Sequence, residues 1–147
     1  AGADFIVIPC NTLHSLIKEL RNKSKVSFLD MVEEVSKEIK NNYKSIGILS
    51  TSKTREDKLY DNKLKGIKIY YPSISQQEIV SKIIIRIIRN KSTEQDKKFL
   101  EEVIDSLIKR GAEKVLLACT DLANIIKENN KTIDSSEILI KVIKLNS

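Results

Sequence analysis

Short apolar runs alternate along this chain with segments of helical periodicity. Each run is four or five residues long and is largely apolar on both alternating faces, which is typical of strands buried on two sides. Such strands occur in parallel sheets that are covered by helices above and below. The pattern therefore predicts an α/β fold with a parallel sheet. The predicted strands are Phe5–Ile8, Ile46–Leu49, Ile67–Tyr71 and Val115–Ala118.

The segments between and after these runs place apolar residues three and four positions apart, as helices with one buried face do. The segment 80–88 contains so many isoleucines that a strand stays open as an alternative there. Gly111 follows another segment at a position suited to a helix C-cap. The predicted helices carry their apolar residues at 13–20, 32–39, 80–88, 100–107 and 139–143.

An internal repeat divides the chain into two related halves. In each half a Gly-Ala-acidic triplet, a strand and a cysteine are followed by a predicted helix with the sequence Ile-Lys-Glu. The cysteine stands eight positions after the glycine in both copies, at Cys10 and Cys119, and the isoleucine stands seven positions after the cysteine. The repeat predicts that both halves place a cysteine at the same structural point.

Composition excludes several classes of function. The net charge of +6 suits an acidic partner or an anionic substrate. However, the lysines are scattered among glutamates and no basic block is interleaved with aromatic residues, so we expect no nucleic-acid partner. No apolar stretch approaches the roughly 20 residues of a membrane helix, and no signal peptide is recognisable. We therefore expect no membrane partner and a cytoplasmic location.

The cysteines are the candidate reactive groups. With two cysteines, no CxxC spacing and one histidine, the chain is not expected to hold a metal or a disulfide. Both cysteines stand where a strand ends and a helix begins, which is where open α/β sheets bind ligands. A helix N-terminus there favours a substrate carboxylate and is expected to lower the cysteine pKa toward neutrality. The alternative is that each cysteine simply continues a hydrophobic strand, because cysteine is among the most buried residue types.

Two thiols that face one ligand suit the inversion of a stereocentre. One thiolate removes the α-proton from one side of the carbon atom, and the opposite thiol returns a proton to the other side. Hydroxyl groups and helix N-termini can stabilise the charge that develops on the substrate carboxylate.

Four segments of the sequence resemble the aspartate/glutamate racemase family. Residues 2–14 (GADFIVIPCNTLH) resemble its first cysteine motif, and residues 116–122 (LLACTDL) resemble its second. Residues 46–54 (IGILSTSKT) are similar to its middle strand and threonine-containing loop, and residues 133–137 (IDSSE) to its closing segment. The resemblance is closest to the aspartate racemase type, and it covers the chain essentially from end to end.

The resemblance implies two pseudo-symmetric α/β domains with the active site in the cleft between them. The first domain would comprise residues 1–27 plus 129–147, and the second residues 28–128. Family members carry further elements before the first cysteine, so the first domain is expected to be incomplete here, and this chain alone is expected to bind substrate poorly or to be inactive. The family racemises aspartate, glutamate or related amino acids without pyridoxal phosphate or a metal, and a homodimer is expected.

The resemblance also assigns roles to individual residues. Cys10 and Cys119 would be the two catalytic acid/base residues. The substrate's α-carboxylate or ammonium group would be held by Asn11, Thr12 and Thr120. Three further positions are expected nearby: Thr51 would line the cleft, and Arg89, or alternatively Lys91, would bind the distal carboxylate.

Two positions keep open roles. Asp121 replaces the glutamate or histidine that the family carries after its second Cys-Thr, and it suits either a role beside the catalytic cysteine or a place in a helix first turn. His14 matches the first motif but is expected to be a local hydrogen-bonding residue, outside the catalytic set.

Three functions follow from these observations. The first is the racemisation of an acidic amino acid, aspartate before glutamate, by two cysteines and without a cofactor. The second keeps the fold and changes the chemistry, as in hydantoin racemases, maleate isomerases and arylmalonate decarboxylases. The third is a noncatalytic α/β module that binds a small carboxylate.

Overall fold

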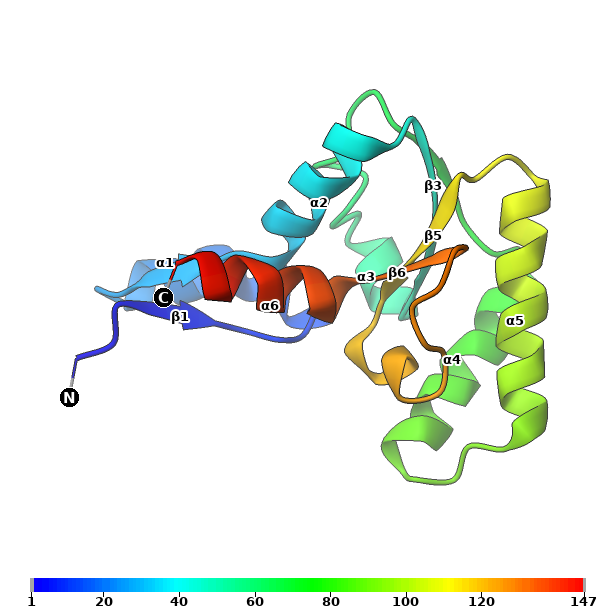
Figure 1. Ribbon diagram of the computed structural model, residues 1–147. Helices are drawn as coiled ribbons and strands as arrows, with labels where there is room; N and C mark the ends of the chain where they lie inside the picture. The colour runs from blue at the N-terminus through cyan, green and yellow to red at the C-terminus, as the bar shows by residue number, and fades with distance from the viewer. Residues whose placement is uncertain (1, 147) are drawn as a thin grey trace.

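The computed structural model describes residues 2–146 and contains two parallel sheets flanked by helices (Figure 1). The smaller sheet pairs β1 with β2, and the larger sheet has the order β4-β3-β5-β6, with every strand pair parallel. The strands are β1 (Phe5–Val7), β2 (Ser27–Leu29), β3 (Ser45–Ser50), β4 (Lys68–Tyr70), β5 (Lys114–Ala118) and β6 (Thr132–Asp134). The α-helices are α1 (Ile17–Lys23), α2 (Met31–Asn42), α3 (Ser52–Glu56), α4 (Ile74–Ile88), α5 (Glu94–Lys109) and α6 (Ser135–Leu145), and the 3-10 helices are η1 (Thr12–Leu16) and η2 (Thr120–Asn124).

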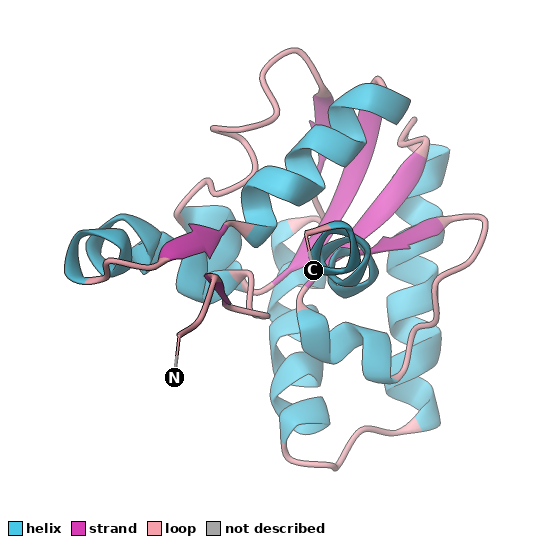
Figure 2. Ribbon diagram, turned by 60° about the vertical axis from the view of Figure 1, so that its left-hand side comes forward, coloured by secondary structure: helices cyan, strands magenta, loops and turns pink. Residues whose placement is uncertain are grey.

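The four-stranded sheet is covered by helices on both faces, as the apolar runs predicted (Figure 2). Successive residues of a strand point to opposite faces, so a strand that is apolar throughout needs two covering layers. In β5, Val115 and Leu117 pack against α4 and α5, whereas Leu116 and Ala118 pack against α2 and α6. All four of these side chains are fully buried.

Gly47 lets α5 approach β3 closely. A β-carbon at this position would lie 3.0 Å from Val115 Cγ2 and 3.2 Å from Leu107 Cβ, closer than ordinary packing allows. The absence of a side chain at this position therefore permits the close contact between the helix and the sheet.

The long helices begin at residues that cap them. Thr93 and Asp96 form a reciprocal capping box at the start of α5, and Ser73 and Gln76 form another at the start of α4. Asp96 also pairs with Arg86 of α4, 2.9 Å from Arg86 Nε, and this pairing lowers the pKa of the Asp96 carboxyl. The ion pair joins α4 and α5 at one end. The segment 80–88, for which a strand had stayed open, lies within helix α4.

The two-stranded sheet is much less covered. Every residue of β1 is only partly buried, and Ser27 in β2 is exposed. The helix predicted around 13–20 is divided into η1 and α1, and its expected buried face is wrong in part: Ile17 is buried, but Leu13 and Leu16 are 49% and 45% exposed. A sheet of two short strands offers too little surface to cover the whole helical segment.

Two further features differ from what was expected. The strands β2 and β6 are too mixed in polarity to stand out in the sequence, so neither was predicted. The strand β6 pairs with β5 in the larger sheet, and β2 pairs with β1 in the smaller sheet. The division into residues 1–27 plus 129–147 and residues 28–128 stays a prediction. The second copy of the repeat forms only η2 where a helix was expected, and Ile126 lies beyond its end. Within residues 2–146, no helix is both long and apolar enough to span a membrane.

Candidate active site

Cys10 lies in a short loop after β1. The loop is tightened by a hydrogen bond from the Cys10 backbone N–H to the Ile8 carbonyl (2.8 Å), and η1 begins at Thr12. The thiol group belongs to a residue of intermediate exposure. The strand ends three residues before the cysteine, so Cys10 lies beyond the carboxyl end of a parallel strand, as expected.

Cys119 directly follows β5 and is buried, with 7% of its surface exposed. The pKa of the Cys119 thiol is raised to about 11, and burial is the largest cause. The charge of Asp121 also raises this pKa, whereas backbone hydrogen bonds from Asp121 and Leu122 lower it. The expectation that a helix N-terminus lowers this pKa is therefore wrong for Cys119. The short η2 helix does not compensate for the loss of solvation at the thiolate.

The side chain of Asp121 lies beside Cys119. The Cys119 Sγ donates to Asp121 Oδ2 at 3.8 Å, a long contact that suits a sulfur donor. Asp121 is itself only partly buried, so solvent reaches its carboxylate. Asp121 also lies in the first turn of η2, so its place in the structure fits both of the roles that the sequence left open.

The two thiols come from different parts of the fold. A negative charge at Cys10 is the smallest of the causes that act on the pKa of Cys119. One cysteine follows a strand of the smaller sheet and the other a strand of the larger sheet, so the two sheets contribute one thiol each.

Three threonine hydroxyls form a cluster between η1 and α3. Thr12 Oγ1 lies 2.9 Å from Thr51 Oγ1 and 3.1 Å from Thr54 Oγ1, and Thr51 donates to Thr54 at 3.1 Å. Thr12 and Thr51, which were predicted to meet at the substrate, are thus brought together. Thr54 was missed, although its position three residues after the helix N-cap Thr51 is a signal that could have indicated it.

Asn11 has a different environment from the one expected. Its side chain is buried, accepts a hydrogen bond from the Tyr60 hydroxyl and donates to Ser135 Oγ at 3.1 Å. Ser135 in turn donates to the carbonyl of Leu117 in β5 at 2.9 Å. Asn11 therefore links the Cys10 loop to the larger sheet, and its role as a substrate ligand stays a prediction.

Comparison with known proteins assigns this arrangement to a family. The family model described as Asp/Glu/hydantoin racemase matches residues 1–143. The chain belongs to this racemase family. The resemblance inferred from the two cysteine motifs is confirmed.

Individual members of the racemase family resemble this chain in sequence and structure. The broad specificity amino-acid racemase RacX of Bacillus subtilis (strain 168) is 32% identical over 145 residues, which cover 95% of this chain and 63% of RacX. An aspartate racemase from Picrophilus torridus superposes with a TM-score of 0.82 at 31% identity, over 98% of this chain and 62% of that one. An aspartate racemase homologue from Pyrococcus horikoshii OT3 gives a TM-score of 0.79 at 26% identity, over 98% and 67%. The chain thus spans a little under two thirds of RacX, and the α/β fold with parallel sheets is confirmed.

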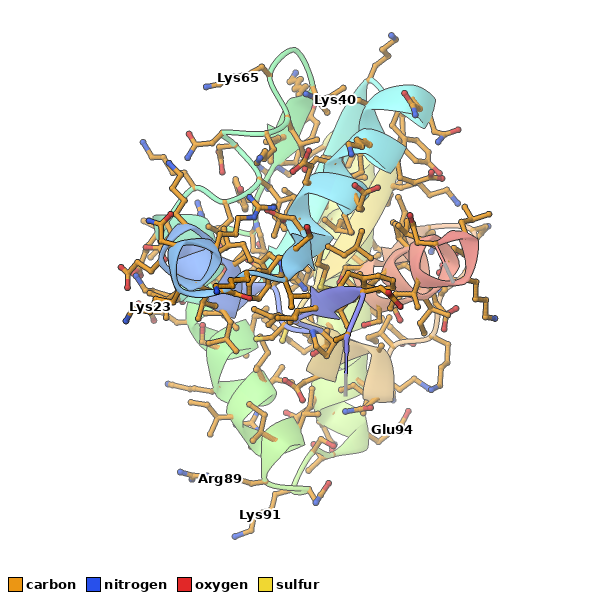
Figure 3. All side chains as sticks on the ribbon, turned by 90° about the vertical axis from the view of Figure 1, so that its left-hand side faces the viewer. Lys23, Lys40, Lys65, Arg89, Lys91 and Glu94 are labelled. Atoms are coloured by element: carbon orange, nitrogen blue, oxygen red, sulfur yellow. The ribbon has the colours of Figure 1, made fainter. Side chains whose placement is uncertain are left out.

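The remaining candidate residues are Thr120, Arg89 and Lys91. Thr120 is partly buried and lines a shallow pocket between η2 and α6 together with Asp134 and Lys141. Arg89 and Lys91 are exposed at the connection between α4 and α5, where their side chains point away from the body of the protein (Figure 3). Binding of a distal carboxylate by Arg89 or Lys91 stays a prediction.

His14 is a hydrogen-bonding residue of the Cys10 loop, as its place in the first motif suggested. Its ring is buried between the Cys10 carbonyl and the N-terminus of α2. Among residues 2–146, no group of three or more His, Cys, Asp or Glu side chains is arranged to hold a metal ion.

Proposed function

We propose that this chain is the cysteine-bearing part of a cofactor-independent racemase for an acidic amino acid, aspartate before glutamate. The observation that carries the proposal is the placement of Cys10 and Cys119, each beyond the carboxyl end of a parallel strand and one from each sheet. Similarity to aspartate racemases supports the substrate class. A homodimer and a cytoplasmic location, which the sequence also suggested, belong to the proposal.

The proposed reaction uses two proton transfers. The thiolate of one cysteine takes the α-proton, and the electron pair of the broken C–H bond passes to the substrate carboxylate. The thiol of the other cysteine then donates its proton to the opposite side of the same carbon atom. Because its pKa is raised to about 11, Cys119 holds its proton at neutral pH and fits the role of the initial donor, with Cys10 as the base.

Hydroxyl groups support the charge that develops during the reaction. The cluster of Thr12, Thr51 and Thr54 includes a residue two positions after Cys10, and Thr12 and Thr51 are partly exposed. One donor of this cluster can turn toward a substrate carboxylate while the other two hydroxyls stay bonded. Stabilisation of this kind is needed because the α-proton of an amino acid is a very weak acid.

The test is exchange of the α-proton in deuterium oxide. The purified chain is incubated under reducing conditions with L-aspartate and, separately, L-glutamate, and the α-proton signal and the enantiomer ratio are followed. We expect deuterium at the α-position together with the D-enantiomer when the chain is joined to the elements that family members carry before the first cysteine, and loss of both in Cys10→Ala and in Cys119→Ala. No exchange by this chain alone would show only that those elements are needed. Lys40→Ala, a change at an exposed position of α2, serves as the matched control that keeps the activity.

Other outcomes separate the alternatives. Exchange that persists in either cysteine variant contradicts the two-thiol mechanism. Binding of aspartate without exchange favours the noncatalytic module, a candidate supported by the burial that keeps the Cys119 thiol protonated. Turnover of a related carboxylate in place of the amino acids favours another isomerase or a decarboxylase of the same fold.

A further inference from the structure

His14 connects the Cys10 loop to α2, a helix that covers the four-stranded sheet. Its ring is 4% exposed and lies between two backbone groups. His14 Nδ1 is 2.8 Å from the carbonyl oxygen of Cys10, and Nε2 is 3.1 Å from the backbone nitrogen of Met31. The ring therefore bridges the loop after β1 and the first turn of α2.

The two contacts determine which nitrogen carries the proton. A carbonyl oxygen only accepts and a backbone N–H only donates, so Nδ1 donates to Cys10 and Nε2 accepts from Met31. The N–H groups in the first turn of a helix have no partner within the helix, which leaves the Met31 N–H free to bond the ring. Only the neutral Nδ1–H tautomer of His14 makes both hydrogen bonds.

The charged neighbours of the ring are already paired. Asp30 Oδ1 lies 3.7 Å from His14 Nε2, but the same oxygen accepts the Glu33 N–H at 3.0 Å as the N-cap of α2. The other oxygen of Asp30 faces Arg21 Nη2 of α1 at 3.4 Å. These contacts hold the carboxylate and leave Nε2 to the Met31 N–H.

The anchor on the other side of the ring is rigid. Met31 is fully buried and belongs to the apolar cluster between α2 and the four-stranded sheet. By contrast, β1, which precedes Cys10, is only partly buried along its whole length. The His14 bridge therefore transfers the fixed position of α2 to a loop that has little packing of its own.

We propose that His14 is a positioning residue that fixes Cys10 relative to Cys119 through the carbonyl of Cys10. This role rests on the proposed function, because it matters for catalysis only if Cys10 exchanges a proton with a substrate. A displacement of about 1 Å at a reacting group can cost about a hundredfold in rate. A bond to the cysteine's own backbone is a direct way to prevent such a displacement.

Three substitutions separate the two contacts. In His14→Asn the side-chain amide can donate near the position of Nδ1, so the bond to Cys10 is retained. In His14→Gln an amide oxygen can reach the position of Nε2, so the bond from Met31 is retained and the bond to Cys10 is lost. His14→Phe fills the space and makes neither bond.

The first measurement does not depend on turnover. The rate of alkylation of Cys10 by iodoacetamide is followed by peptide mapping in the parent chain and the three variants. We expect a rate near the parent value in His14→Asn and a several-fold increase in His14→Gln and His14→Phe, because the partly buried thiol becomes more accessible. Equal rates in the Asn and Phe variants would show that His14 only fills space, and would overturn the proposal.

The second measurement uses the parent protein alone and holds even if every variant unfolds. His14 is the sole histidine of the chain, so the imidazole region of a ¹H–¹⁵N spectrum contains one ring. We expect the pattern of a single Nδ1–H tautomer. A dominant Nε2–H tautomer, or rapid exchange between the two, would contradict the bridge.

The third measurement tests the catalytic consequence. In the exchange assay, His14→Gln and His14→Phe should lose at least about tenfold in kcat, with a much smaller change in KM, and His14→Asn should recover most of it. If the parent chain shows no exchange even when it is joined to the elements that precede the first cysteine in family members, the proposed function fails, and the alkylation and tautomer measurements still decide the role of His14. If the parent is active and His14→Phe keeps its kcat, the positioning role fails while the racemase assignment stands.

Discussion

The two sheets hold their cysteines by different means. Cys119 follows a strand whose Val115, Leu116, Leu117 and Ala118 are fully buried between two layers of helices. Cys10 follows a strand that is only partly buried, in a sheet of two strands. Apolar packing therefore positions one thiol, whereas hydrogen bonds from Asn11 and His14 position the other.

This difference has a chemical consequence. Packing removes water from Cys119 and raises its pKa, which suits a proton donor. A loop held by hydrogen bonds leaves Cys10 partly accessible, which suits a group that must meet the substrate as a base. Apolar packing and hydrogen bonding thus provide two identical side chains with different environments.

The largest expected effect is a loss of stability when the packing of the four-stranded sheet is disturbed, compared with that of the two-stranded sheet. Leu107→Ala removes a fully buried side chain from the contact between α5 and β3, and should lower the free energy of unfolding by about 2–5 kcal/mol. Phe28→Ala in the partly buried β2 should cost less than half as much. Urea denaturation followed by circular dichroism measures both changes, and equal losses would contradict the contrast between the two sheets.

An intermediate loss of stability is expected where Tyr60 bonds Asn11 of the Cys10 loop. Tyr60→Phe removes the hydroxyl that donates to Asn11 and leaves a buried acceptor without a partner, at a cost of about 1–3 kcal/mol. Tyr71→Phe is the matched control, because the Asp61 carboxylate that it releases is partly exposed and can bind water. If Tyr71→Phe is as destabilising as Tyr60→Phe, the link through Asn11 does not hold the Cys10 loop to the larger sheet.

The smallest expected effect concerns the charge next to Cys119. Asp121→Asn removes a negative charge that raises the pKa of the thiol, so the midpoint of its alkylation rate against pH should fall from about 11 by less than about one unit. Burial, the largest cause, is unchanged by this substitution. Asp105→Asn, on the exposed side of α5, is the control that should leave the midpoint in place. A midpoint that rises in Asp121→Asn would be the opposite of what the geometry requires.

The same raised pKa also determines how stability depends on pH. The folded state keeps the Cys119 proton up to about pH 11, whereas the thiol of the unfolded chain loses it near its ordinary value of 9.0. The contribution of Cys119 is therefore complete below pH 9 and is lost as the pH rises toward 11.

Local patterns predicted much of the fold. The strands β3 and β5 and the helices α2, α4 and α5 have apolar residues at regular spacing, because each buries a whole face or both faces. Both cysteines could be placed beyond strand ends from the repeat alone. The strands β2 and β6 could not be predicted, because polar residues such as Ser27, Thr132 and Asp134 interrupt them. The strands β1 and β4 are equally short but lie in apolar runs of four and five residues.

The sequence by itself determined the family, the α/β class and the identity of the two cysteines, because these depend on residue types and spacing along the chain. Only the tertiary structure decided how deeply each cysteine is buried and which hydrogen bonds the residues beside it make. Burial of Cys119 outweighs the short helix that follows it, and Asn11 is bonded to Tyr60 and Ser135, which are 49 and 124 positions away. Solvation and long-range hydrogen bonds depend on which segments meet in space, and no local pattern records that.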